Sequence, residues 1–292
     1  MRELVKKLRK YQIKIRKAIN NQMQGDFHSV FKGSGLEFDD VRSYQYGDDV
    51  RIIDWHVSAK GHGTFVKTFK EEKEQIVFFL LDVSASQEIG NPGRRKIDIA
   101  KEICGVLALS AVHEQSQIGL VGYSDQKEKY IKPGKGERHA MQVISNLMRL
   151  QPNSSKTNLK KAILYTLNML RRKSVVIFIS DFIDEGYEHN LRGLARKHDL
   201  VVIHINDKQE TNLPKLGIIP LVDKESKKTL WINTSSLSFR HKLHDSFAGK
   251  KETLEQFARR NQANYVNIYT DEDYVPKLIK LFRVRNKSKR IA

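Results

Sequence analysis

Mostly apolar segments of strand length alternate with amphipathic segments along most of the chain. The apolar segments lie at residues 76–81, 118–123, 175–179, 200–205 and 265–269, with two shorter ones at 218–222 and 229–232. Apolar residues recur at helical spacing over residues 95–113, 138–150, 159–170, 187–197, 239–260 and 274–282. This alternation predicts an α/β fold, with a doubly wound, mostly parallel sheet and helices on both of its faces.

The beginning of the chain departs from this pattern. Its first residues carry apolar side chains at the spacing of one helix face, namely Leu4, Leu8, Tyr11, Ile15 and Ile19. Such an amphipathic helix can lie on a membrane or pack against its own domain, and we favour packing. Residues 33–69 are rich in Gly, Asp and Arg, with β-like pieces at 50–53 and 64–69. The predicted organisation is an N-terminal helix with an accessory segment (1–74), an α/β domain (75–285) and a basic tail (286–292).

The amino-acid composition limits the choice of binding partner and of cellular compartment. With 52 Lys+Arg against 34 Asp+Glu, the formal charge is +18, which suits nucleic acid or an acidic partner but also an ordinary solvated surface. The single cysteine, Cys104, lies in an apolar helical stretch and excludes an internal disulfide. No apolar run approaches the roughly 18 residues that a membrane span needs, and no signal peptide is evident. We therefore predict a cytoplasmic protein.

Candidate chemistry lies at the ends of two predicted core strands. Asp82, Ser84 and Ser86 follow the strand at 76–81 at alternate positions, so that one carboxylate and two hydroxyls can converge. Asp181 directly follows the strand at 175–179 and its serine, and Thr157 precedes a predicted helix. Sites in such sheets form at the carboxyl ends of the strands. Hard oxygen ligands of this kind suit Mg²⁺, with Mn²⁺ or Ca²⁺ as alternatives.

The same residues also have ordinary structural interpretations. Thr157 can cap the helix that follows it, and Asp181 can cap a helix after its strand. For either residue taken alone, a capping role is as well supported as a role as metal ligand. Five oxygen-bearing positions taken together favour a metal site.

These motifs resemble those of a known family. The spacing of Asp82, Ser84, Ser86, Thr157 and Asp181 is similar to the metal-ion-dependent adhesion site of von Willebrand A domains. The preceding segment resembles the bacterial family called domain of unknown function 58. Its matching residues are Gly33, Gly35, Glu37, Phe38, Arg42, Tyr44, Gly47, Asp48, Arg51, Asp54 and Trp55. For this block we favour a structural role, an ion-pair cluster around Trp55 with packing from Val50, Ile52 and Ile53, over a second binding surface.

The resemblance implies a von Willebrand A-like fold, the metal site and a partner. Family members are typically encoded beside AAA+ ATPases of the MoxR type, for which they look like adaptors or co-chaperones. The expected function is therefore metal-dependent binding of such an ATPase, or of another protein that presents an acidic docking residue. No small-molecule substrate and no catalysis are expected.

Two other classes stay open as alternatives. A nucleic-acid-binding protein would use the basic residues 2–17 and 283–290, although no recognised binding motif accompanies them. A Mg²⁺-dependent phosphoryl-transfer enzyme also places Asp at strand ends. The chain has no phosphate loop of the Gly-x-x-x-x-Gly-Lys type, however, and Ser84 stands where a dehalogenase-type phosphatase would carry a second Asp.

Overall fold

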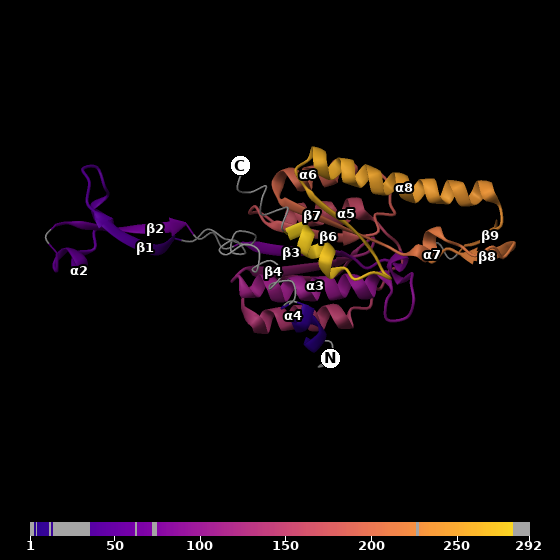
Figure 1. Ribbon diagram of the computed structural model, residues 1–292, viewed down its shortest axis with the longest axis horizontal. Helices are drawn as coiled ribbons and strands as arrows, with labels where there is room; N and C mark the ends of the chain where they lie inside the picture. Colours follow the sequence, from indigo (N-terminus) through magenta and orange to yellow (C-terminus); the bar gives the residue numbers. More distant parts are fainter. Residues whose placement is uncertain are drawn as a thin grey trace. The chain divides into compact units, whose positions relative to one another are not determined.

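The computed structural model (Figure 1) describes residues 3, 5–11, 13, 36–61, 63–71, 75–225 and 228–282. Its main sheet has the strand order β10-β7-β6-β3-β4-β5. The strands are β3 (Ile76–Asp82), β4 (Gln117–Tyr123), β5 (Lys127–Gly134), β6 (Val175–Ser180), β7 (Asp199–Asn206) and β10 (Asn264–Tyr269). All neighbours are parallel except β4 and β5. The predicted mostly parallel α/β fold is confirmed.

Helices cover both faces of this sheet (Figure 1). One face packs against α3 (Lys96–His113), α4 (Gly136–Arg149) and the helical residues 275–282; the other packs against α5 (Leu159–Met169), α6 (Glu188–Lys197) and α8 (Leu237–Arg260). Successive side chains of a strand point to opposite faces. Phe79 and Leu81 of β3 therefore lie in one apolar core, and Phe78 and Leu80 in the other. Burial on both faces explains why β3 is an unbroken apolar run.

The described N-terminal residues pack against α3. Leu8 is fully buried, and a Cβ atom at Gly105 would lie 2.8 Å from its Cδ1 atom, so that glycine permits the close approach. Lys7 donates to Glu102, and Tyr11 packs edge-on against Tyr274. These residues thus belong to the compact unit of the sheet, whereas our division grouped them with the accessory segment. Leu4, Ile15, Ile19 and the tail at 286–292 lie outside the described residues.

Residues 32–75 form a second compact unit. Its described part contains an antiparallel pair, β1 (Leu36–Ser43) and β2 (Phe65–Glu71), and the short helices η2 (Val50–Ile52) and α2 (Trp55–Ser58). The β-like piece predicted at 64–69 is thus a strand, but the prediction of a β-like piece at 50–53 is wrong. Asp49 caps a 3₁₀ turn there by accepting a hydrogen bond from the Arg51 backbone N–H, and Ile53 forms only an isolated bridge with Val66.

Ion pairs do organise this accessory unit. Arg42 donates two hydrogen bonds of 2.7 Å to Asp48, whose carboxylate also accepts from the Gln45 backbone. Arg51 pairs with Asp49 at 2.7 Å. The Asp54 carboxylate caps α2 by accepting from two backbone N–H groups, and it faces Lys67 at 3.7 Å. These contacts are local, since all of the residues that they join lie within this accessory unit.

The predicted packing around Trp55 needs correction. The side chains of Trp55 and Val50 are 69% and 62% exposed, so neither belongs to a core. Gly47 has a φ of +105°, which favours glycine, and the Tyr44 N–H bonds the Thr64 carbonyl. Glu37 and Phe38 lie in β1, while Gly33 and Gly35 lie outside the described residues.

His198, at the end of α6, makes the fold sensitive to acid. It is buried, and its Nδ1 atom accepts a hydrogen bond from the Ser174 N–H at 3.3 Å. Burial lowers its pKa to about 4, below the ordinary value near 6.5. The neutral ring therefore contributes stability that is complete above about pH 6.5 and is lost as the pH falls toward 4. At about 1.4 kcal/mol per pH unit, the upper limit of the loss is about 3 kcal/mol, and solvent screening reduces it.

We expect His198→Asn, whose side-chain oxygen can replace the Nδ1 acceptor, to flatten this part of the stability profile. The measurement is the free energy of unfolding in urea between pH 4 and pH 7. His244→Asn, on an exposed side chain, is the control and should follow the unmodified protein. Parallel profiles for His198→Asn and the unmodified protein would contradict the assignment.

Candidate functional site

The candidate site lies where the strand order reverses. From β3 the chain moves to β4 on one side of the sheet, and it later returns to β6 on the other side of β3. The crevice at the carboxyl ends of two such strands is the usual place for a site in an open α/β sheet. Leu81 and Ile179 are partners in the parallel ladder. Asp82 and Ser180 directly follow these two residues and therefore lie side by side where the two strands end.

Asp82 is the centre of a buried network of hydroxyl groups. Its Oδ1 atom accepts from the Ser84 N–H at 3.0 Å and from the Ser84 hydroxyl at 2.7 Å. Its Oδ2 atom accepts from the Ser180 hydroxyl at 2.7 Å and from the Gln87 amide at 3.2 Å. The Ser84 and Ser86 hydroxyl oxygens are 3.1 Å apart. The structure thus brings together the first three predicted residues.

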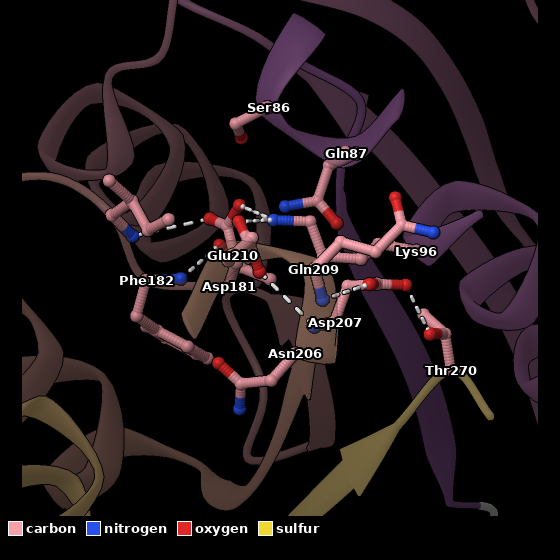
Figure 2. A network of polar contacts seen from close by, with 12 residues as sticks. Ser86, Gln87, Lys96, Asp181, Phe182, Asn206, Asp207, Gln209, Glu210 and Thr270 are labelled. Carbon is pink, nitrogen blue, oxygen red and sulfur yellow. Dashed lines mark hydrogen bonds and ion pairs between the residues drawn. The ribbon is translucent and has the colours of Figure 1, made fainter. Parts of the chain in front are cut away.

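Asp181 directly follows β6 and lies beside this network, where it contacts Lys96 (Figure 2). The backbone N–H of Ile183 donates to its Oδ1 atom at 3.2 Å, and the nearby Ser86 hydroxyl helps to lower the pKa of its carboxyl group. Its Oδ2 atom lies 2.7 Å from the ammonium group of Lys96, which also contacts Glu210 Oε1 at 2.6 Å. Lys96 is fully buried at the first position of α3. An ammonium group is therefore enclosed beside the four predicted residues.

Burial and charge act differently on the acidic groups of the site. Burial, and then the charge of Asp181, raises the pKa of Asp82 to about 6. Burial, the largest single effect, would also raise the pKa of Asp181, but the charge and hydrogen bond of Lys96 together with the Ile183 N–H and the Ser86 hydroxyl outweigh it, and the pKa falls below the ordinary value. Burial raises the pKa of Glu210 in spite of Lys96. Asp181 is thus held ionised, while Asp82 is a carboxylate whose charge is poorly compensated by the protein alone.

Thr157 lies on the neighbouring loop rather than in the network itself. This loop contacts η3 (Ala85–Glu88) through a hydrogen bond of 3.0 Å from the Ala85 N–H to the Ser155 carbonyl. Asn158, not Thr157, caps α5. The Thr157 hydroxyl instead donates to Glu225 Oε1 at 2.5 Å. Asp181 likewise caps no helix, because α6 begins only at Glu188.

The residues present fit a hard divalent cation. Two carboxylates and two hydroxyls converge, all of them oxygen donors of the kind that Mg²⁺ prefers alongside retained waters. The Oε1 atom of Gln87 is buried without a hydrogen-bond partner beside Asp82. A buried polar atom without a partner is unusual, and a cation with its waters would supply one. Among the described residues no group of three or more His, Cys, Asp and Glu could hold a metal, so the hydroxyls are essential to the assignment.

Two charged residues of the site were not predicted. In the sequence, Lys96 lies at the start of a predicted helix, and nothing else there marks it as a site residue. Glu210 forms a capping box with Asp207 at the start of α7 (Lys208–Thr211), and Thr270 donates to that same Asp207 (Figure 2). The Asp-x-x-Glu pattern after a core strand could have revealed Glu210 as a helix start. It could not have revealed its contact with Lys96.

A family model described as "Protein of unknown function DUF58" matches residues 40–253. The chain belongs to this family. It is also 24% identical to an uncharacterized protein of Mycobacterium bovis over 292 residues, which cover 98% of this chain and 90% of the relative. The DUF58 assignment agrees with the resemblance drawn from the sequence.

Solved structures with similar folds include two of note. An aerotolerance-related membrane protein from Bacteroides fragilis is 14% identical, with a TM-score of 0.49 over 73% of this chain and 99% of that one. A von Willebrand factor type A structure from Catenulispora acidiphila is 11% identical, with a TM-score of 0.37 over 63% of this chain and 43% of that one. In the described part of the DUF58 chain, no helix is both long enough and apolar enough to cross a membrane.

Proposed function

We propose that this DUF58 chain is a protein-binding module that docks an acidic side chain of its partner on a divalent cation. Asp82, Ser84, Ser86 and Asp181 would hold the cation, with Thr157 on the adjacent loop. The observation that carries the proposal is the convergence of the first four side chains at the point where the strand order reverses. Mg²⁺ is the proposed ion, with Mn²⁺ and Ca²⁺ as alternatives.

The charge of the donor set supports docking of a carboxylate. Serine and threonine hydroxyls are neutral ligands, and the Asp181 charge is already shared with Lys96. A divalent cation held in this way keeps positive charge and can exchange a bound water for a carboxylate from outside. The formal charge of +18 would steer an acidic partner toward the protein, an effect that weakens with salt.

A pocket beside the site offers room for such a side chain. Its volume is about 400 Å³, and it is lined by residues of η3, by the loop at 152–155 and by Lys224. The proposed partner is a MoxR-type AAA+ ATPase in the cytoplasm, for which this chain would act as an adaptor or co-chaperone.

The contacts of Asp82 favour binding over catalysis. Each of its carboxylate oxygens already accepts two hydrogen bonds, and these contacts hold the group as a ligand rather than as a free nucleophile. The basic surface keeps nucleic-acid binding as the second candidate. A gel-shift experiment across a salt series distinguishes it, because binding to phosphates falls steeply with salt whether or not Mg²⁺ is present.

Capture from native lysate tests the proposed function. With Mg²⁺ present, the tagged chain should retain an AAA+ ATPase, and chelator or Asp82→Ala should release it because the docking charge is lost. Asp245→Ala, which removes an exposed carboxylate of α8, is the matched control and should retain the ATPase. Equal recovery with Mg²⁺, with chelator and from Asp82→Ala would refute cation-dependent docking.

A further inference from the structure

A hairpin of the chain itself reaches the candidate site. It consists of β8 (Ile218–Val222) and β9 (Thr229–Asn233), and Figure 1 shows it extending beyond α7. Its turn carries Glu225, whose N–H is held by the Asp223 side chain at 3.0 Å. This carboxylate is the acidic group that contacts Thr157. The hairpin therefore presents to the site the same chemistry that the proposed partner would present.

Polar contacts of the described turn residues attach the turn to the site. Besides the Thr157–Glu225 hydrogen bond, the Ser155 hydroxyl donates to the Glu225 carbonyl at 3.4 Å. Lys224 forms an ion pair of 3.1 Å with Glu88 at the end of η3. The turn is thus attached to both loops of the candidate site, the loop that carries Thr157 and the loop that follows β3.

The strands of the hairpin, by contrast, are weakly attached. None of the residues of β8 and β9 is buried, and Ile218, Val222, Leu230 and Trp231 are more than half exposed. Segments with few buried apolar contacts open at low free-energy cost. Contacts of the turn with the site therefore restrain a weakly packed hairpin, and a competing carboxylate can release it.

We propose that Glu225 is an internal carboxylate that supports the cation site through Thr157, without being a metal ligand itself, and that it covers the docking position of the partner's acidic side chain until a partner displaces the hairpin. The inference rests on the proposed cation site. Glu225 then has two roles: it supports the cation together with Thr157, and it keeps the site closed to weak acidic competitors. Displacement of the hairpin would open the site and would release the hairpin with its exposed apolar side chains.

Binding of Mn²⁺ alone, followed by electron paramagnetic resonance, tests the first role. Glu225→Gln keeps the shape of the side chain but removes its charge, and we expect the affinity for Mn²⁺ to fall by about tenfold or more, as for other groups that support metal ligands. Glu255→Gln breaks an exposed ion pair with Arg259 within α8, so it should leave the affinity within about twofold. Equal affinities for Glu225→Gln and the unmodified chain would overturn the proposal.

A nitroxide on the hairpin tests the second role. Thr229→Cys places the label on an exposed strand residue, while the native Cys104 is buried and does not compete for the label. The distance from Mn²⁺ to the nitroxide should be narrowly distributed, and Glu225→Gln should broaden it. If Glu225→Gln leaves this distance distribution unchanged, the proposal is overturned, whereas Mn²⁺ binding and the proposed function stand. Absence of Mn²⁺ binding to the unmodified chain would overturn both.

Discussion

Replacement of Lys96 by methionine is expected to lower the free energy of unfolding by about 3–5 kcal/mol, the usual cost of removing one partner from a buried ion pair. The ammonium group is fully buried and lies within 2.7 Å of Asp181 and 2.6 Å of Glu210. Methionine fills a similar volume but leaves two buried carboxyl groups facing each other without a counter-charge. Urea unfolding followed by circular dichroism at pH 7.5, in the presence of chelator, measures the change.

A lysine on the surface provides the matched control. Lys208 pairs with Asp271 at 2.7 Å, but both side chains are at least half exposed. Lys208→Met should therefore leave the unfolding curve almost unchanged, since solvent screens such pairs. A loss below about 1 kcal/mol in Lys96→Met, the range of an exposed pair, would show that the buried triad contributes far less than its geometry implies.

The core strands could be predicted because they are buried on both faces. β3 and β6 are continuous apolar runs, and between amphipathic helices a short run of that kind indicates a central strand. β5 (Lys127–Gly134) was missed. It is the antiparallel edge strand, only one of its eight residues is buried, and it carries three lysines and a proline. Edge strands are under little pressure to be apolar, so their sequences resemble loops.

The site was predictable only where its residues are close in sequence or tied to strand ends. Asp82, Ser84 and Ser86 form one short motif, and Asp181 follows a core strand, so topology alone brings them together. Lys96 meets Asp181 and Glu210 across 85 and 114 residues, and Glu225 meets Thr157 across 68. Each of these contacts depends on where a helix or a hairpin packs. No local pattern specifies that packing.

Asp82→Asn is expected to abolish measurable Mg²⁺ binding in isothermal titration calorimetry. Asparagine keeps the size of the side chain but removes one of the two charges in the donor set, and loss of a group that only supports a ligand already costs about 10–100-fold in metal affinity. The affinity should therefore fall by at least about a hundredfold. Asp271→Asn, at an exposed ion pair, should leave it unchanged.

The same variant shows whether lost binding reflects lost structure. Burial raises the pKa of Asp82 to about 6, so its ionisation opposes folding: the stability that the protonated group contributes is complete below about pH 4 and is lost as the pH rises through 6. In chelator at pH 7.5, Asp82→Asn removes this buried charge and should be at least as stable as the unmodified chain. Mg²⁺ should then raise the melting temperature of the unmodified chain only, because a ligand stabilises the state that binds it. Mg²⁺ binding that survives in Asp82→Asn would place the cation elsewhere. Loss of both binding and stability would mean that Asp82 is needed mainly for folding.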